Sequence, residues 1–176
     1  MRFRSSRPLG AVILAIAAWL LAAPLARAER PVGIAVSAGQ FNTLEKDVSY
    51  EAGWEAQFAP RRFRLAGLSR FLPAVSPAVG GLATSQGTLY VYGGFRFDLP
   101  LGAAWRIGMQ EAAGLYYHDF GRNLGGSLEF RSGIELSRRL GWRSRLGVLL
   151  YHLSNAGFYG RNPGTESLVV TFTTKP

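Results

Sequence analysis

Three side chains that together could perform acyl transfer lie near the end of the chain, at His152, Ser154 and Glu166. A serine nucleophile, a histidine base and a carboxylate that orients the imidazole are the parts of serine-type acyl transfer. With the two-residue period of a β-strand, His152 and Ser154 fall on the same, mostly apolar face of segment 142–154. If this segment forms a hairpin with segment 165–173, Glu166 shares that face.

The rest of the chain supplies the elements that would position this patch. Segment 126–138 sets Leu128 and Phe130 on one face against Glu129 and Arg131 on the other, which is typical of a strand between lipid and a polar barrel interior. Eight segments have this period-two character: 32–40, 47–58, 70–83, 88–97, 104–117, 126–138, 142–154 and 165–173. We therefore predict an all-β fold, an eight-stranded antiparallel transmembrane β-barrel.

A soluble β-sandwich is the competing fold, because a chain of this length could bury a core. Long apolar faces, short connections and strands of about ten residues favour the membrane barrel. An even number of strands also closes into a barrel without an exposed edge. The third segment, 70–83, fits least well, since Pro73 and Pro77 cannot donate a hydrogen bond to a neighbouring strand.

Residues 1–28 have the parts of a secretory signal peptide: arginines near the start, an apolar stretch over 9–23, and a small-x-small cleavage site that ends at Ala28. An N-terminal membrane anchor is the alternative, but the apolar stretch is short for a spanning helix. Cleavage leaves residues 29–176 as the barrel domain. It removes four arginines and no acid, and so lowers the net charge from +9 to +5.

The motif HLSNAG at 152–157, with Asn162 and with Glu166 twelve residues after Ser154, resembles the active-site segment of the PagL family of outer-membrane lipid A 3-O-deacylases. The resemblance implies a serine esterase that hydrolyses the ester-linked 3-hydroxyacyl chain at position 3 of lipid A in lipopolysaccharide. In the expected mechanism Ser154 attacks the ester, His152 takes and returns the proton, and Glu166 holds the imidazole.

Three residues are expected to assist this triad. Asn155 can offer its amide to the oxyanion, together with the backbone N–H of Gly157, whereas Asn162 is expected to stiffen the loop. The positive charge suits the phosphates of lipopolysaccharide, and an exported chain without a recognition motif is not expected to bind nucleic acid. The sequence has no cysteine and no metal-ligand cluster, so we expect no cofactor. A homodimer is left open.

Orientation follows from the usual rule that bacterial barrels begin and end on the periplasmic side. The site then faces the outer leaflet of the outer membrane, where lipopolysaccharide resides. Three alternatives stay open at this point: a patch that is merely hydrated above the hydrocarbon, a non-enzymatic small outer-membrane barrel, and an outer-membrane phospholipase. The phospholipase family pairs Ser and His with Asn and needs calcium, whereas no acidic calcium cluster is visible in this sequence.

Overall fold

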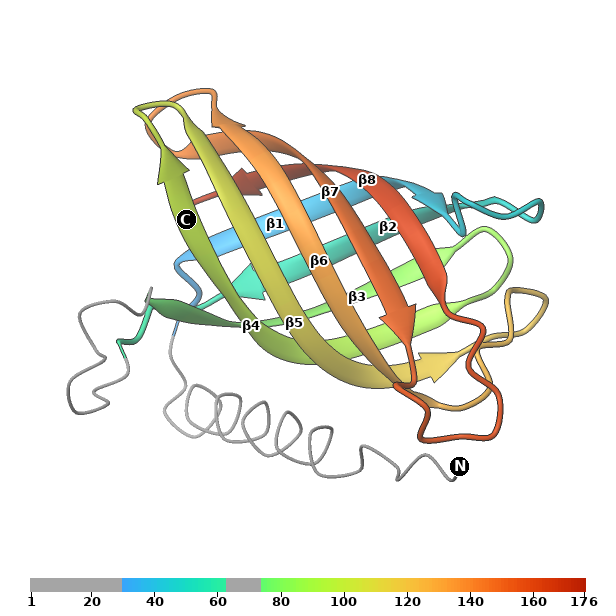
Figure 1. The fold of residues 1–176 in the computed structure, drawn as a ribbon. Helices are drawn as coiled ribbons and strands as arrows, with labels where there is room; N and C mark the ends of the chain where they lie inside the picture. The colour runs from blue at the N-terminus through green and yellow to red at the C-terminus, as the bar shows by residue number, and fades with distance from the viewer. Residues whose placement is uncertain (1–29, 63–73) are drawn as a thin grey trace.

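The computed structural model describes residues 30–62 and 74–176 and forms a closed antiparallel barrel in which β1 also pairs with β8 (Figure 1). The strands are β1 Gly33–Phe41, β2 Ser49–Gln57, β3 Val75–Thr84, β4 Leu89–Leu101, β5 Trp105–Tyr117, β6 Leu128–Arg139, β7 Ser144–Ser154 and β8 Thr165–Thr174. The predicted eight-stranded barrel is thereby confirmed. The expected signal peptide, residues 1–28, lies outside the described residues.

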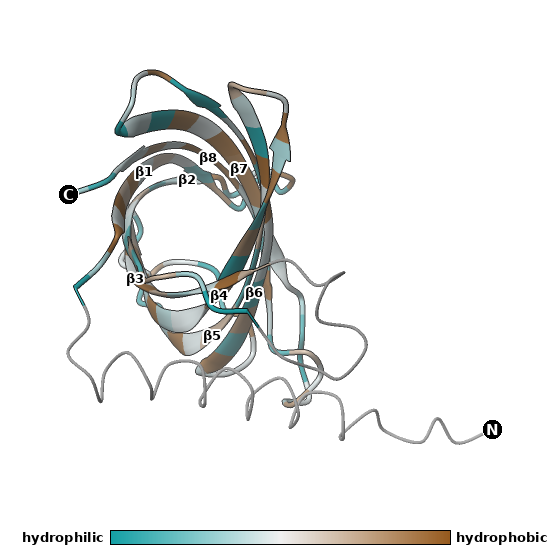
Figure 2. Cartoon of the chain, turned by 90° about the vertical axis from the view of Figure 1, so that its left-hand side faces the viewer, coloured by the Kyte–Doolittle hydropathy of each residue, from teal (hydrophilic) through white to brown (hydrophobic). Residues whose placement is uncertain are grey.

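Alternation along the strands separates an apolar exterior from a polar interior. Figure 2 shows how hydrophobic and hydrophilic residues follow one another along the strands. On β4 the side chain of Tyr90 is 0% exposed, whereas that of its neighbour Val91 is 64% exposed. On β6 Arg131 is buried and Ile134 is exposed. Because successive side chains of a strand point to opposite faces, this alternation lets the outer face contact lipid while the polar groups stay enclosed.

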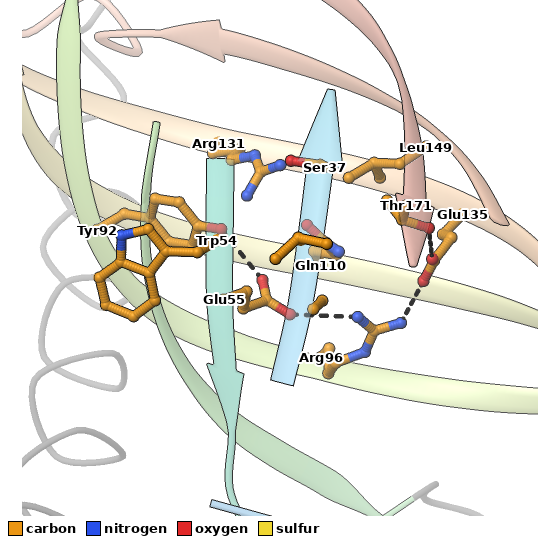
Figure 3. A pocket seen from close by; sticks show the side chains of 12 residues that line it. Ser37, Trp54, Glu55, Tyr92, Arg96, Gln110, Arg131, Glu135, Leu149 and Thr171 are labelled. Atoms are coloured by element: carbon orange, nitrogen blue, oxygen red, sulfur yellow. Dashed lines mark hydrogen bonds and ion pairs between the residues drawn. The ribbon is translucent and has the colours of Figure 1, made fainter. Parts of the chain in front are cut away.

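The enclosed polar groups form a connected network (Figure 3). Arg96 lies between two carboxylates, with 3.2 Å from its Nη1 to Glu55 Oε1 and 2.5 Å from its Nη2 to Glu135 Oε2. Glu135 also accepts a hydrogen bond from the hydroxyl of Thr171 on β8. The network therefore joins β2, β4, β6 and β8 across the interior, and each of these two carboxylates is paired with a cation.

Aromatic rings fill the space beside this network. The guanidinium of Arg131 lies over the rings of Tyr92 and Tyr151, at 4.7 Å and 4.1 Å from their centroids. The hydroxyl of Tyr151 donates in turn to Glu51. A cavity of about 20 Å³ remains among the lining side chains, enough for about one water molecule. The interior at this level is therefore a packed core, not a channel.

Strand β3 contains Pro77, one of the two prolines that made the predicted third segment fit least well. Pro77 is paired with Phe95 of β4, whereas the register with β2 begins one residue later, at Ala78. The carbonyl of Pro77 still accepts a hydrogen bond from Phe58 N–H over 2.9 Å. The proline is tolerated because it stands at the margin of the β2–β3 ladder. Pro73 lies outside the described residues.

The loops that follow β1, β3, β5 and β7 lie at one end of the barrel, and the C-terminus lies at the other (Figure 1). Arg122 ties three of these loops together: its Nε donates to Gly164 O over 2.8 Å and its Nη2 to Glu45 Oε1 over 3.2 Å. The predicted site residues all lie at this end. In the described part of the chain, no helix is long and apolar enough to cross a membrane.

Candidate active site

The hairpin β7–β8 brings two of the predicted residues into contact. Its register places His152 opposite Glu166, and His152 Nδ1 lies 3.0 Å from Glu166 Oε1. The two side chains are 45% and 34% exposed on the outer surface of the barrel. The next outward pair along the hairpin is Leu150 and Leu168, both exposed aliphatic side chains. A carboxylate that engages Nδ1 leaves Nε2 of the imidazole for another partner.

Ser154 lies on the same outward face, two residues beyond His152 on β7, with Phe130 of β6 as its neighbour across the ladder. Two residues span about 6.6 Å along a strand, so Ser154 and His152 occupy successive outward positions of β7. Among the described residues no hydrogen bond joins Ser154 Oγ to His152. Catalytic hydrogen bonds are often long in unliganded enzymes and tighten when the substrate binds.

A glycine that the sequence analysis did not single out packs against the imidazole. Gly164 has a φ of +65° in the loop that precedes Glu166, and a Cβ at this position would lie 2.7 Å from His152 Cε1. A side chain here would meet both a left-handed backbone and the ring itself. Gly164 therefore fixes the space in which the histidine can sit. The sequence offered one signal for this residue, namely its position in a loop two residues before the predicted carboxylate Glu166.

Asn155 is buried and organises the β7–β8 loop. Its Nδ2 donates to Leu124 O and to Arg161 O, both over 2.8 Å, and its Oδ1 accepts from Gly157 N–H over 3.0 Å. The donors expected at the oxyanion, the Asn155 amide and the Gly157 N–H, are thus already engaged by groups of the β5–β6 and β7–β8 loops. An amide has only two hydrogens to donate, and both hydrogens of Asn155 Nδ2 are used in these bonds. The Asn155 side chain therefore supports the loop.

Asn162, in contrast to Asn155, has an amide group that is only partly engaged in hydrogen bonds. Its Oδ1 accepts from Asn155 N–H over 3.0 Å, which holds its amide group against the residue that follows Ser154. None of the described residues accepts a hydrogen bond from its Nδ2, and the side chain is exposed. Asn162 therefore bridges two parts of the β7–β8 loop and has an uncommitted donor beside the residue that follows Ser154.

A groove of about 390 Å³ runs over the outer surface beside His152 and Glu166. Four apolar side chains line it: Phe97, Met109, Ile134 and Leu150. Two polar side chains also line it, Glu111 of β5 and Ser132 of β6, which the sequence analysis did not single out. The period of two could have indicated them, since it places both on the lipid-facing side of their strands. No group of three or more His, Cys, Asp or Glu side chains in residues 30–62 and 74–176 could hold a metal ion.

The fold and the site together define a class of protein: a small membrane barrel that carries a histidine–carboxylate pair on its lipid-facing surface. The sequence model of the family described as lipid A 3-O-deacylase (PagL) matches residues 35–175. The chain therefore belongs to the PagL family, and it is a lipid A deacylase of the outer membrane, as the sequence analysis predicted. Comparison with curated proteins found no match.

Solved structures show the same fold at low sequence identity. The outer membrane enzyme PagL is 18% identical, with a TM-score of 0.57 over 82% of this chain and 99% of its own. A de novo designed transmembrane β-barrel is 10% identical, with a TM-score of 0.54 over 84% and 98%. Neisserial surface protein A is 13% identical, with a TM-score of 0.53 over 82% and 96%. A natural enzyme, a designed barrel and a surface protein share this scaffold, so the fold alone does not specify the chemistry.

Proposed function

We propose that this deacylase works through a triad of Ser154, His152 and Glu166 and releases the 3-hydroxyacyl chain from position 3 of lipid A. The 3.0 Å contact between His152 Nδ1 and Glu166 Oε1 on the outer surface of the barrel carries the proposal. Ionisable side chains cost free energy on a lipid-facing surface, so a pair held there without a function would be a net cost. The match of residues 35–175 to the family model supports ester hydrolysis of lipid A as the reaction of this pair.

The reaction follows in two acyl transfers. Ser154 Oγ attacks the ester carbonyl while His152 Nε2 takes its proton, and Glu166 accepts a hydrogen bond from the protonated ring through Nδ1. The tetrahedral intermediate expels the sugar alkoxide, which takes the proton from His152 and leaves an acyl-enzyme. Water then attacks the acyl-enzyme with His152 as base, and this step frees the fatty acid and restores the Ser154 hydroxyl.

The oxyanion donor in this proposal is Nδ2 of Asn162, a revision of the role expected for Asn155. Asn155 N–H donates a hydrogen bond to Asn162 Oδ1, which fixes the Asn162 amide next to the nucleophile. The two hydrogens on Asn162 Nδ2 are uncommitted. A fixed donor aimed at the developing charge stabilises the tetrahedral intermediate without reorganisation. The engaged amide of Asn155 supports the loop that holds Asn162 in place.

The active site faces the outer leaflet in this proposal. It lies at the barrel end that carries the loops 118–127 and 155–164, whereas two of the three connections at the other end, residues 102–104 and 140–143, are short turns. Outer-membrane barrels carry their longer loops outside and short turns on the periplasmic side. This orientation places His152 and Ser154 at the depth of the acyl esters of lipopolysaccharide.

Mass spectrometry of lipid A from cells with and without the protein tests the function. We expect a loss of one 3-hydroxyacyl chain in cells that express the wild-type chain and intact lipid A in cells that express Ser154→Ala. Purified enzyme should keep its full turnover in EDTA, because the triad itself carries the proton transfer. Unchanged lipid A, or calcium-dependent hydrolysis of phospholipid in its place, would contradict the proposal.

A further inference from the structure

A second polar pair lies on the lipid-facing surface, one strand beyond the histidine. Ser132 of β6 is the register partner of His152, and Glu111 of β5 is the register partner of Ser132. Ser132 Oγ donates to Glu111 Oε2 over 2.7 Å. With Glu166 opposite His152 on β8, four polar side chains form one row across β5, β6, β7 and β8. The triad uses only two members of this row.

Apolar residues surround the unused pair. The next row toward the opposite end of the barrel contains Met109, Ile134 and Leu150, all on the outward face. No described residue donates a hydrogen bond to Glu111 Oε1. A carboxylate with one partner on a lipid-facing surface is costly, and a hydrogen-bond donor from a ligand would offset that cost.

The row also lies along the groove that would receive the substrate. Glu111, Ser132 and His152 line the 390 Å³ groove together with aliphatic and aromatic side chains. An acyl chain attacked at Ser154 would descend from the loop end past this row and into the apolar part of the groove. The row therefore meets the substrate near the ester and not near the end of the chain.

Distances along the sheet identify which substrate atom reaches the pair. Because Ser154 is paired with Phe130, Ser132 is its diagonal neighbour, about 7–8 Å away. The attacked carbon lies about 3 Å from the nucleophile, the third acyl carbon lies two C–C bonds further, roughly 2.5 Å in a straight line, and a hydrogen bond adds about 2.8 Å. A hydroxyl on the third carbon of the acyl chain therefore reaches the position of Ser132, and the Glu111 carboxylate lies 2.7 Å from Ser132 Oγ.

We propose that Glu111 and Ser132 form a subsite that binds the 3-hydroxyl of the scissile acyl chain and makes the enzyme selective for 3-hydroxyacyl esters. The inference rests on the proposed function. The substrate hydroxyl donates to the Glu111 carboxylate, and Ser132 holds the other carboxylate oxygen in place. An acyl chain without the hydroxyl would leave Glu111 Oε1 without a donor on the lipid-facing surface, and sites that hydrogen-bond a substrate hydroxyl reject analogues that lack it.

Two matched substrates test this inference: a lipid A monosaccharide that carries either a 3-hydroxytetradecanoyl or a tetradecanoyl ester at position 3. We expect wild-type kcat/KM to favour the hydroxylated ester by about 10²-fold. Glu111→Leu should bring the ratio close to one by slowing the hydroxylated ester alone, and Glu111→Gln, which keeps an acceptor, should retain part of the preference. Met109→Leu is the matched control from the same groove and should leave the ratio unchanged.

A wild-type ratio that persists in Glu111→Leu would overturn the inference while leaving the proposed function intact. Loss of both ester activities in Ser132→Ala, to the level of Ser154→Ala, would also overturn it, because Ser132 would then belong to the reaction itself. If the wild-type enzyme hydrolyses neither ester, the proposed function fails and the inference fails with it. Resistance of each variant to SDS before heating verifies that the barrel has formed.

Discussion

The inside and the outside of this barrel use polar side chains in opposite ways. Inside, Arg96 is enclosed between Glu55 and Glu135, and the cavity that remains there is about 20 Å³. Outside, His152 and Glu166 contact each other at the border of a groove of about 390 Å³. Enclosed, paired charges join the strands to one another. Charges on the outer surface keep free hydrogen-bonding capacity for a substrate that arrives through the lipid.

This contrast predicts that variants of the two regions should fail in different assays. Outer-surface variants should lose turnover and keep the barrel, because removing a polar group from a lipid-facing surface does not hinder insertion. Interior variants should lose stability and keep the activity of whatever fraction is folded. Turnover per folded molecule and resistance to unfolding therefore have to be measured on the same samples.

The largest effect is expected for the triad itself. Ser154→Ala and His152→Ala should each lower kcat by about 10³-fold or more, and the double variant should be no worse than either single one, because without the nucleophile the base has nothing to activate. Glu166→Ala should lose less, since His152 can still act when it is less well oriented. Release of 3-hydroxy fatty acid from purified lipid A measures these rates. Additive losses in the double variant would contradict a triad that acts as one unit.

The next effect concerns the oxyanion donor. Asn162→Asp keeps an oxygen that can accept from Asn155 N–H but replaces the amide donor with a carboxylate. We expect a loss of about 10²–10³ in kcat, with the loop still ordered. Limited trypsin digestion at Arg161 reports on the loop, and it should be as slow as in the wild-type protein. Near-normal turnover in Asn162→Asp would remove Asn162 from the chemistry.

A smaller loss of turnover is expected for a substitution of Gly164, whose backbone packs against the His152 imidazole. Gly164→Ala adds a Cβ that must displace His152, and small misplacements of a catalytic group can cost about 10²-fold in rate. Gly160→Ala is the matched control, because a Cβ there meets no atom within 4 Å and its backbone is not left-handed. It should keep wild-type turnover. Equal losses in both variants would indicate general loosening of the loop and not displacement of the histidine.

The interior variant should show the smallest change in turnover. Arg96→Met leaves the Glu55 and Glu135 carboxylates without their cation, and breaking a buried ion pair costs about 3–5 kcal/mol. The free energy of unfolding, followed by urea titration in detergent, should fall by that amount, while kcat per folded molecule stays within about twofold of wild type. Arg139→Met changes an exposed arginine on β6 and should alter neither quantity. A large fall in kcat for Arg96→Met alone would show that the two regions are coupled.

The fold could be predicted from the sequence because one physical signal, the alternation of lipid-facing and enclosed residues, repeats along every strand. The contact between His152 and Glu166 could also be predicted from the sequence, since a hairpin brings neighbouring strands together. The assignment of strand three was uncertain because the position of Pro77 at the ladder margin depends on where β2 stops pairing. The signal peptide over residues 1–28 and the possible homodimer stay predictions.

Other features of the site could not be read from the sequence, for physical reasons. The hydrogen bonds of Asn155 go to backbone carbonyls of two different loops, at Leu124 and Arg161, and no residue pattern encodes such partners. The proximity of Glu111, Ser132 and His152 depends on the register of two successive strand pairs. That register follows from the loop lengths and from the closure of the whole barrel.

The most direct test of the account is to locate the nucleophile by covalent labelling. The enzyme in detergent is treated with an alkyl fluorophosphonate, and the modified residue is identified by peptide mass spectrometry alongside the loss of activity. The account predicts a single adduct on Ser154 whose formation follows the loss of turnover, and no adduct in His152→Ala. An adduct on Ser132, or full turnover by enzyme that carries the adduct on Ser154, would contradict it.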